Sequence, residues 1–64
     1  MSELQQRFLS ELKQKQALTA IYLKNGIKLK GRIAGFDEDV IYIQEPSPQI
    51  IYIKNISTIA ELLF

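Results

Sequence analysis

The 64-residue sequence predicts a mainly β domain in which one N-terminal α-helix precedes a small, strongly bent β-barrel. Three observations predict this class. Apolar residues recur every four positions near the N-terminus, and from Thr19 onward they alternate with polar residues. Glycines stand at two expected bends, Gly31 and Gly35. We expect a single domain over residues 1–64, with the helix at about 3–15 and the barrel at about 19–64.

The N-terminal helix is predicted by its start signal and by its apolar spacing. Ser2 is followed three residues later by Gln5, which is the pattern of a capping box. The residues expected to form the buried stripe of this helix are Leu4, Phe8, Leu9 and Leu12.

The first hairpin is predicted by the alternation on either side of an Asn-Gly turn at residues 25–26. A two-residue loop would place Leu23 on the same face as Lys28 and would mix core with surface. A three-residue loop over residues 24–26, with its glycine in the left-handed conformation, pairs Leu23 with Ile27 instead. We therefore expect the three-residue loop.

This register also predicts a surface. It brings Tyr22 opposite Lys28, and Ala20 opposite Lys30, so that an aromatic ring and a row of cations share one exposed face. Proteins bind single-stranded nucleic acid with cations that follow the phosphates and rings that stack on the bases. The pattern therefore favours a surface for single-stranded nucleic acid.

The later strands are predicted by two apolar runs, residues 40–43 and 50–53, which a proline-containing turn at 45–49 separates. Continuously apolar strands are buried on both faces, or are buried on one face and covered by another chain. The last segment, residues 57–64, begins as a strand and ends in Leu-Leu-Phe. We expect this end to pack on the barrel or on a neighbouring subunit.

Length and composition restrict the function. A chain this short buries about 60% of the surface that its unfolded form exposes, so a lone monomer would be marginally stable. Cysteine and histidine are both absent, and we expect no metal, no cofactor and no catalytic residue. Oligomerisation is the remaining means of stabilisation. The longest apolar runs are four residues, so we expect a cytoplasmic protein that no membrane holds.

The net charge of +1 hides an asymmetry along the chain. Residues 1–32 hold seven cations and two carboxylates, a balance of +5, whereas residues 33–64 hold one cation and five carboxylates, a balance of −4. Such a division suggests a basic surface for an anionic partner.

Several motifs together resemble the Hfq family of bacterial Sm-like RNA chaperones, over about residues 4–59. The most specific is Tyr-Leu-x-Asn-Gly-Ile-Lys-Leu-x-Gly at residues 22–31, and the others are Phe-Asp at 36–37, Gln-Ile-Ile-Tyr at 49–52 and Ile-Ser-Thr at 56–58. The resemblance implies an Sm fold, with a helix on a bent five-stranded antiparallel sheet, and strand pairing between neighbours into a homohexameric ring. It also implies binding of mRNA and small regulatory RNA in post-transcriptional regulation and the stress response.

The family binds adenine-rich RNA on one face of its ring. This sequence has the family's residues at the matching positions of that face, which are Tyr22, Gly26, Ile27, Lys28, Leu29, Gln49 and Thr58. A glutamine amide can pair with adenine N6 and N7. Lys30 replaces a glutamine common in the family, which strengthens attraction to the RNA backbone and loosens base selectivity.

The opposite face, around the pore, departs from the family pattern. Gln5 matches a residue that contacts uridine, but Asp39, preceded by Glu38, stands where the family has a stacking Phe or Tyr. Lys54 occupies the histidine position of the Tyr-Lys-His signature, and Ile53 its lysine position. Loss of a stacking ring costs about 1–3 kcal/mol per base, so the resemblance predicts weakened binding of uridine-rich RNA.

The rim of the ring, which the family uses for annealing RNA strands, is also thin in positive charge. Lys13 and Lys15 remain, whereas Gln14 and Gln16 stand where further cations are common.

Two other functions are compatible with the residues. An Sm-fold scaffold, or a subunit of a mixed ring with another Hfq, would act through protein contacts with little RNA binding. An enzyme would use Asp37, Glu38 and Asp39 as metal or acid–base groups, but carboxylates in a turn more often cap the backbone or face solvent.

Overall fold

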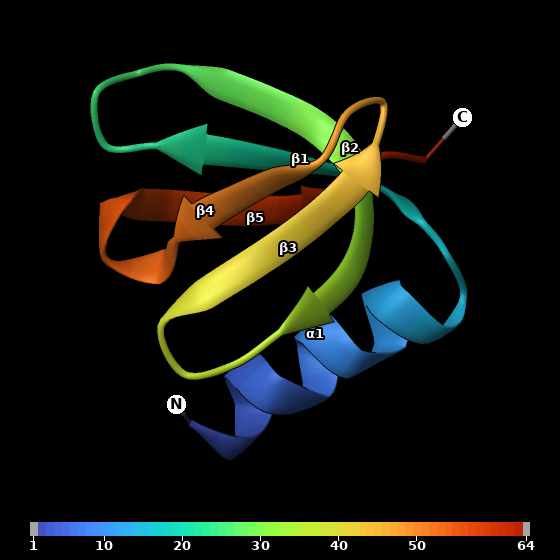
Figure 1. Cartoon of the computed structure of the whole chain (residues 1–64). Helices are drawn as coiled ribbons and strands as arrows, with labels where there is room; N and C mark the ends of the chain where they lie inside the picture. The colour runs from blue at the N-terminus through green and yellow to red at the C-terminus, as the bar shows by residue number, and fades with distance from the viewer. Residues whose placement is uncertain (1, 64) are drawn as a thin grey trace.

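A computed structural model describes residues 2–63 and shows one helix followed by five antiparallel strands (Figure 1). This confirms the predicted fold class. None of the helical segments within residues 2–63 is long and apolar enough to cross a membrane. The elements are α1 (Glu3–Gln14), β1 (Leu18–Leu23), β2 (Lys28–Phe36), β3 (Val40–Glu45), β4 (Gln49–Tyr52), the 3-10 helix η1 (Ile53–Asn55) and β5 (Ile56–Glu61).

The helix α1 begins with the predicted cap, because the Gln5 amide donates a hydrogen bond of 3.1 Å to Ser2 Oγ. Only half of the predicted stripe is buried. Leu9 and Leu12 are fully buried, whereas Leu4 is 74% exposed. Residues four apart drift by about 40° around a helix of 3.6 residues per turn, so a long i, i+4 series turns off the narrow buried face. The other residue of the series, Phe8, is 38% exposed.

The five strands form one sheet in the order β4-β3-β2-β1-β5. The sheet is bent so strongly that its concave side encloses the core, and α1 closes one end of that core (Figure 1). The bend is accompanied by two register shifts along β2. Because β4 and β5 are the edges of the sheet, the predicted barrel is not closed by hydrogen bonds in the single chain. The buried core consists of Leu9, Leu12, Ile21, Ile33, Ile41, Ile43 and Ile51.

The first hairpin has the predicted register. Tyr22 pairs with Lys28, and the Leu23 amide donates a hydrogen bond of 2.8 Å to the Ile27 carbonyl. Gly26 has a φ of 92°, a conformation that side chains other than hydrogen rarely adopt. The three-residue loop is therefore confirmed.

The second hairpin, β3–β4, is also confirmed, although Ile53 lies in η1 and not in a strand. Its strands are buried on one face only. Ile51 is 6% exposed, whereas Ile50 and Tyr52, which point to the other side of β4, are 59% and 54% exposed. Of the two alternatives for apolar strands, the single chain excludes burial on both faces and leaves cover by another chain as the prediction.

The end of the chain packs only in part. The Leu62 amide donates a hydrogen bond of 2.9 Å to the Leu18 carbonyl, but Leu63 is 82% exposed. Phe64 lies outside the described residues. Packing of this end on a neighbouring subunit stays a prediction.

Gly31 marks the closest approach of β2 to β3. A Cβ atom there would overlap the Ile43 side chain and the Glu45 carbonyl oxygen, whereas a Cβ at Gly35 would meet no atom within 4 Å. We expect Gly31→Ala to lower the free energy of unfolding by about 1–3 kcal/mol because it overpacks the sheet. The matched variant Gly35→Ala should change it by less than about 0.5 kcal/mol. Denaturant unfolding at one protein concentration measures both, and equal stabilities would contradict the role assigned to Gly31.

Candidate nucleic-acid interface

The convex face of the first hairpin carries a row of three predicted site residues. Tyr22 of β1 pairs with Lys28 of β2 on one side and with Thr58 of β5 on the other. Lys28 Nζ lies 5.4 Å from the centroid of the Tyr22 ring, within the range of a cation–π contact. The structure thus brings together a half-exposed ring and an exposed cation.

The neighbouring residues extend this face. Lys30 is exposed and follows Lys28 on the same side of β2, and it pairs with Ala20, which is fully buried. At the tip of the hairpin, beside Gly26, Ile27 is 52% exposed. Ala20 is therefore covered, and the cations and the ring form the accessible part of the predicted face.

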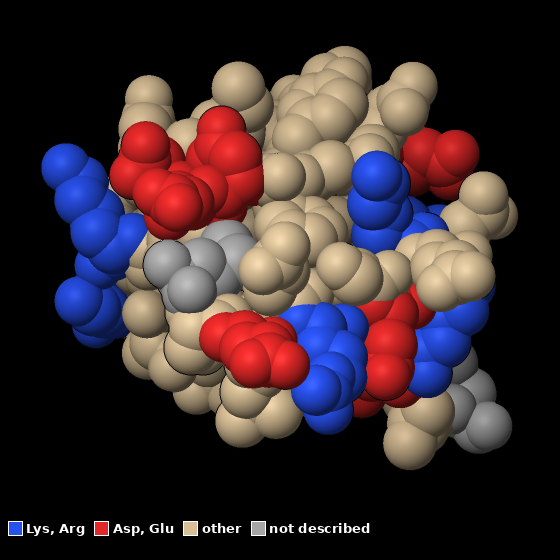
Figure 2. Space-filling view, turned by 90° about the horizontal axis from the view of Figure 1, so that it is seen from below, with Lys and Arg blue, Asp and Glu red and all other residues tan. Residues whose placement is uncertain are grey.

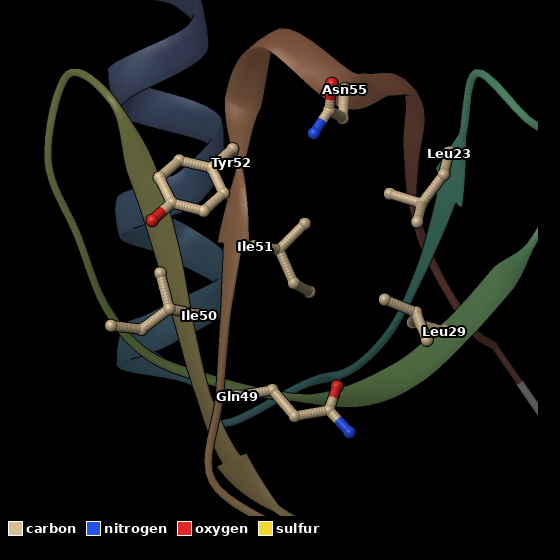
Figure 3. A pocket seen from close by; sticks show the side chains of 7 residues that line it. All are labelled: Leu23, Leu29, Gln49, Ile50, Ile51, Tyr52 and Asn55. Carbon is tan, nitrogen blue, oxygen red and sulfur yellow. The ribbon is translucent and has the colours of Figure 1, made fainter.

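Gln49 borders a separate pocket of about 350 Å³ on the concave side, between β4 and the first hairpin (Figure 3). Leu23, Leu29 and Ile51 point into this pocket, and the amides of Gln49 and Asn55 stand at its two ends. Ile50 and Tyr52 border it from the other side of β4. Apolar walls with a few polar groups suit a flat heterocyclic base.

The pocket shows what the sequence reasoning found and what it missed. Gln49 and Leu29, which the resemblance implied, do lie in one site, but Leu29 faces the opposite side of the hairpin from Tyr22 and Lys28. In a single chain the predicted adenine site is therefore divided into two parts. Asn55 was not predicted, because only the turn in η1 brings its amide to the pocket.

The residues predicted for the pore face also lie in two hollows. Lys54 lines one of about 490 Å³ with Glu38, Asp39, Tyr52 and Ile53. Lys54 Nζ lies 6.0 Å from the centroid of the Tyr52 ring.

Asp39 approaches this segment through the backbone, since the Ile53 amide donates a hydrogen bond of 2.9 Å to the Asp39 carbonyl. Gln5 lies in the other hollow, beside Phe8 and Thr58, and Ile53 borders both. Two unpaired carboxylates thus stand near the predicted uridine position, since no ion pair within residues 2–63 uses Glu38 or Asp39.

Asp37 has a structural role. Its Oδ1 accepts hydrogen bonds from the Asp39 and Val40 amides at 2.8 and 2.9 Å, and these bonds lower the pKa of the carboxyl group. Because folding lowers this pKa, the carboxylate stabilises the turn above its ordinary pKa, and this contribution is lost as the pH falls through the lowered value. Among residues 2–63, no group of three or more potential ligands is placed to hold a metal ion.

The rim differs from its prediction. Lys15 forms an ion pair of 2.9 Å with Glu61, which offsets its charge. Lys13 lines a groove of about 300 Å³ together with Arg32, a residue that the sequence reasoning assigned to no site. The alternation of cations along residues 28–32 was the signal that could have identified Arg32.

Figure 2 shows the face of the molecule that bears α1. Acidic and basic side chains are mixed on it, and a cluster of acidic side chains stands at one edge. This face is thus not uniformly basic.

Comparisons with known proteins give a family and close structural neighbours. The family model described as "Hfq protein" matches residues 4–62. A crystal structure of "the pleiotropic translational regulator, Hfq" superposes with a TM-score of 0.88 at 26% sequence identity, covering 94% of this chain and 92% of that one. An Hfq protein from Anabaena sp. has the same fold, with a TM-score of 0.88 at 23% identity over 95% of this chain and 100% of that one.

Proposed function

The chain belongs to the Hfq family, and from this premise we propose that it is an RNA chaperone whose preferred ligand is adenine-rich single-stranded RNA. The family is one of RNA-binding proteins that form rings, not of enzymes. We place mRNA and small regulatory RNA as its partners in the cytoplasm. One Sm-like domain, assembled with further copies into a homohexameric ring, is the active form.

The observation that carries the proposal is the Lys28–Tyr22–Thr58 row on the convex face. An exposed aromatic ring stacks on a base at a gain of about 1–3 kcal/mol, and an adjacent ammonium group contacts the following phosphate. Because Lys28 Nζ already lies 5.4 Å from the ring centroid, a base and its phosphate meet the ring and the charge together.

Selectivity for adenine is assigned to the pocket beside β4. The exposed Gln49 side chain donates a hydrogen bond of 3.3 Å from Nε2 to Ser47 Oγ, a contact that a base can replace without stranding a buried group. The freed amide can donate to adenine N7 and accept from N6. Leu29 supplies an apolar wall for the ring of the base.

Ring assembly makes these weak contacts useful. The two parts of the adenine site lie on opposite sides of the hairpin in one chain, so we propose that a neighbouring subunit completes each site. Repetition around the ring then adds further sites along one RNA strand, and each added contact becomes intramolecular.

The pore face is proposed to bind uridine-rich RNA weakly. Glu38 and Asp39 repel phosphates, and no aromatic ring stands at Asp39 to stack on uracil. Lys54 offsets this repulsion only in part, since it is one cation beside two carboxylates.

A scaffold or mixed-ring subunit is the alternative, and the unpaired strands β4 and β5 would serve it equally well. Salt separates the two functions. Binding through several lysines weakens as salt rises because counterions are released, whereas a scaffold that acts through protein contacts has no such RNA binding to lose.

We expect Gln49→Ala and Lys28→Ala to weaken binding of a short oligo-A. The loss should be about 1–3 kcal/mol for Gln49→Ala, and Lys28→Ala should reduce the slope of log K against log salt by about 0.7 per phosphate contact. Gln14→Ala and Arg7→Ala, exposed residues on α1, are the matched controls. Fluorescence anisotropy at several salt concentrations measures these effects, and wild-type affinity in both site variants would refute the assignment.

We also expect oligo-U to bind more weakly than oligo-A of equal length at the same salt. Asp39→Phe should raise the affinity for oligo-U, because it removes a carboxylate and supplies a ring worth about 1–3 kcal/mol per stacked base. The affinity for oligo-A should stay unchanged. Equal affinities of the unmodified protein for the two RNAs would be incompatible with the proposed weak pore face.

A further inference from the structure

We infer that the cations of β2 and the end of α1 form a track that leads RNA from the adenine face over the outer edge of the sheet. The track consists of Lys28, Lys30, Arg32 and Lys13, and its far end is the groove between α1 and β2. This inference rests on the proposed function and assigns to the same RNA a second contact, made by phosphates beyond the adenine tract.

The first part of the track follows from strand geometry. Lys28, Lys30 and Arg32 are all exposed, whereas Gly31 between the last two is buried. Alternate residues of a strand point to one face at a spacing of about 6.8 Å. Three cations therefore stand in a line on the face that carries Tyr22, at steps comparable with the phosphates of an extended strand.

The second part depends on how α1 ends. Gln16 has a φ of 51°, the left-handed conformation that often terminates a helix. Its carbonyl oxygen accepts a hydrogen bond of 3.2 Å from Arg32 Nε. This bond fixes the guanidinium group while its terminal N–H groups remain available, and a fixed planar fork suits a phosphate group.

The groove of about 300 Å³ collects the polar groups that a backbone needs. Lys13 comes from α1, Arg32 from β2 and Gln44 from β3, and Glu45 is its single carboxylate. Among the described residues neither Lys13 nor Arg32 forms an ion pair, in contrast to Arg7 and Lys15. The groove thus keeps two free cations against one carboxylate.

The chemistry of the groove indicates what it recognises. No aromatic side chain lines it, so it offers no platform for a base. Its cations and amides can contact phosphate oxygens, which position RNA without reading its sequence. The segment bound there is consequently any single strand that continues from the adenine tract.

Two RNA probes test the track, a short oligo-A and the same oligo-A with an oligo-C extension, placed at either end in separate measurements. We expect the unmodified protein to bind one of the extended RNAs more tightly than the short one. Arg32→Ala and Lys13→Ala should each weaken binding of that extended RNA about two- to fivefold, the range that an exposed ion pair supports. Neither should change binding of the short oligo-A.

Three further variants separate charge from folding. Arg7→Ala removes a cation outside the groove and should leave both affinities unchanged. Arg32→Lys keeps the charge and should retain most of the gain from the extension, and Glu45→Gln should increase that gain. Light scattering of each variant checks that its assembly equals that of the unmodified protein.

The outcomes distinguish the two levels of the argument. Failure of the unmodified protein to bind the short oligo-A overturns the proposed function. Normal binding of the short oligo-A overturns only the track if the extension adds no affinity, or if Arg32→Ala and Lys13→Ala preserve its gain as Arg7→Ala does.

Discussion

The two unpaired edges of the sheet are the constraint on which the rest of the structure depends. β4 and β5 end the strand order, so each presents backbone N–H and C=O groups without partners in the sheet. Such edges invite pairing with another chain. The exposed apolar residues Ile50, Tyr52 and Phe8 accompany them. A short chain that must cover these groups, and that belongs to a family of ring-forming proteins, meets both needs by joining β4 of one subunit to β5 of the next.

The same constraint connects assembly with RNA binding. In one chain, Tyr22 and Lys28 lie on the convex side of the first hairpin, whereas Gln49 lies beside the pocket on its concave side. Gln49 begins β4, and Thr58 belongs to β5, so pairing of these two edges would bring polar groups of neighbouring subunits onto one surface. The residues that bind the base are then held by the strands that close the ring, and stability and function have a common origin.

The sequence predicted local geometry well and long-range placement poorly. The Asn25-Gly26 turn and the alternation around it were sufficient for the hairpin register, because pairing there is decided within a few residues. The exposure of Leu4 could not be predicted, since spacing alone does not say how wide a helix face the sheet covers. Asn55 and the contact of Arg32 with Gln16 were missed because each depends on how separate elements dock. The place of Gln49 came from family resemblance and not from its own surroundings in the sequence.

The mass of the assembly in solution tests the central claim most directly. Multi-angle light scattering at micromolar concentration should give about six times the 7.4 kDa of one chain, because paired edges close a symmetric ring. A mass equal to one chain under those conditions would contradict the account, since it would show that β4 and β5 remain unpaired in solution.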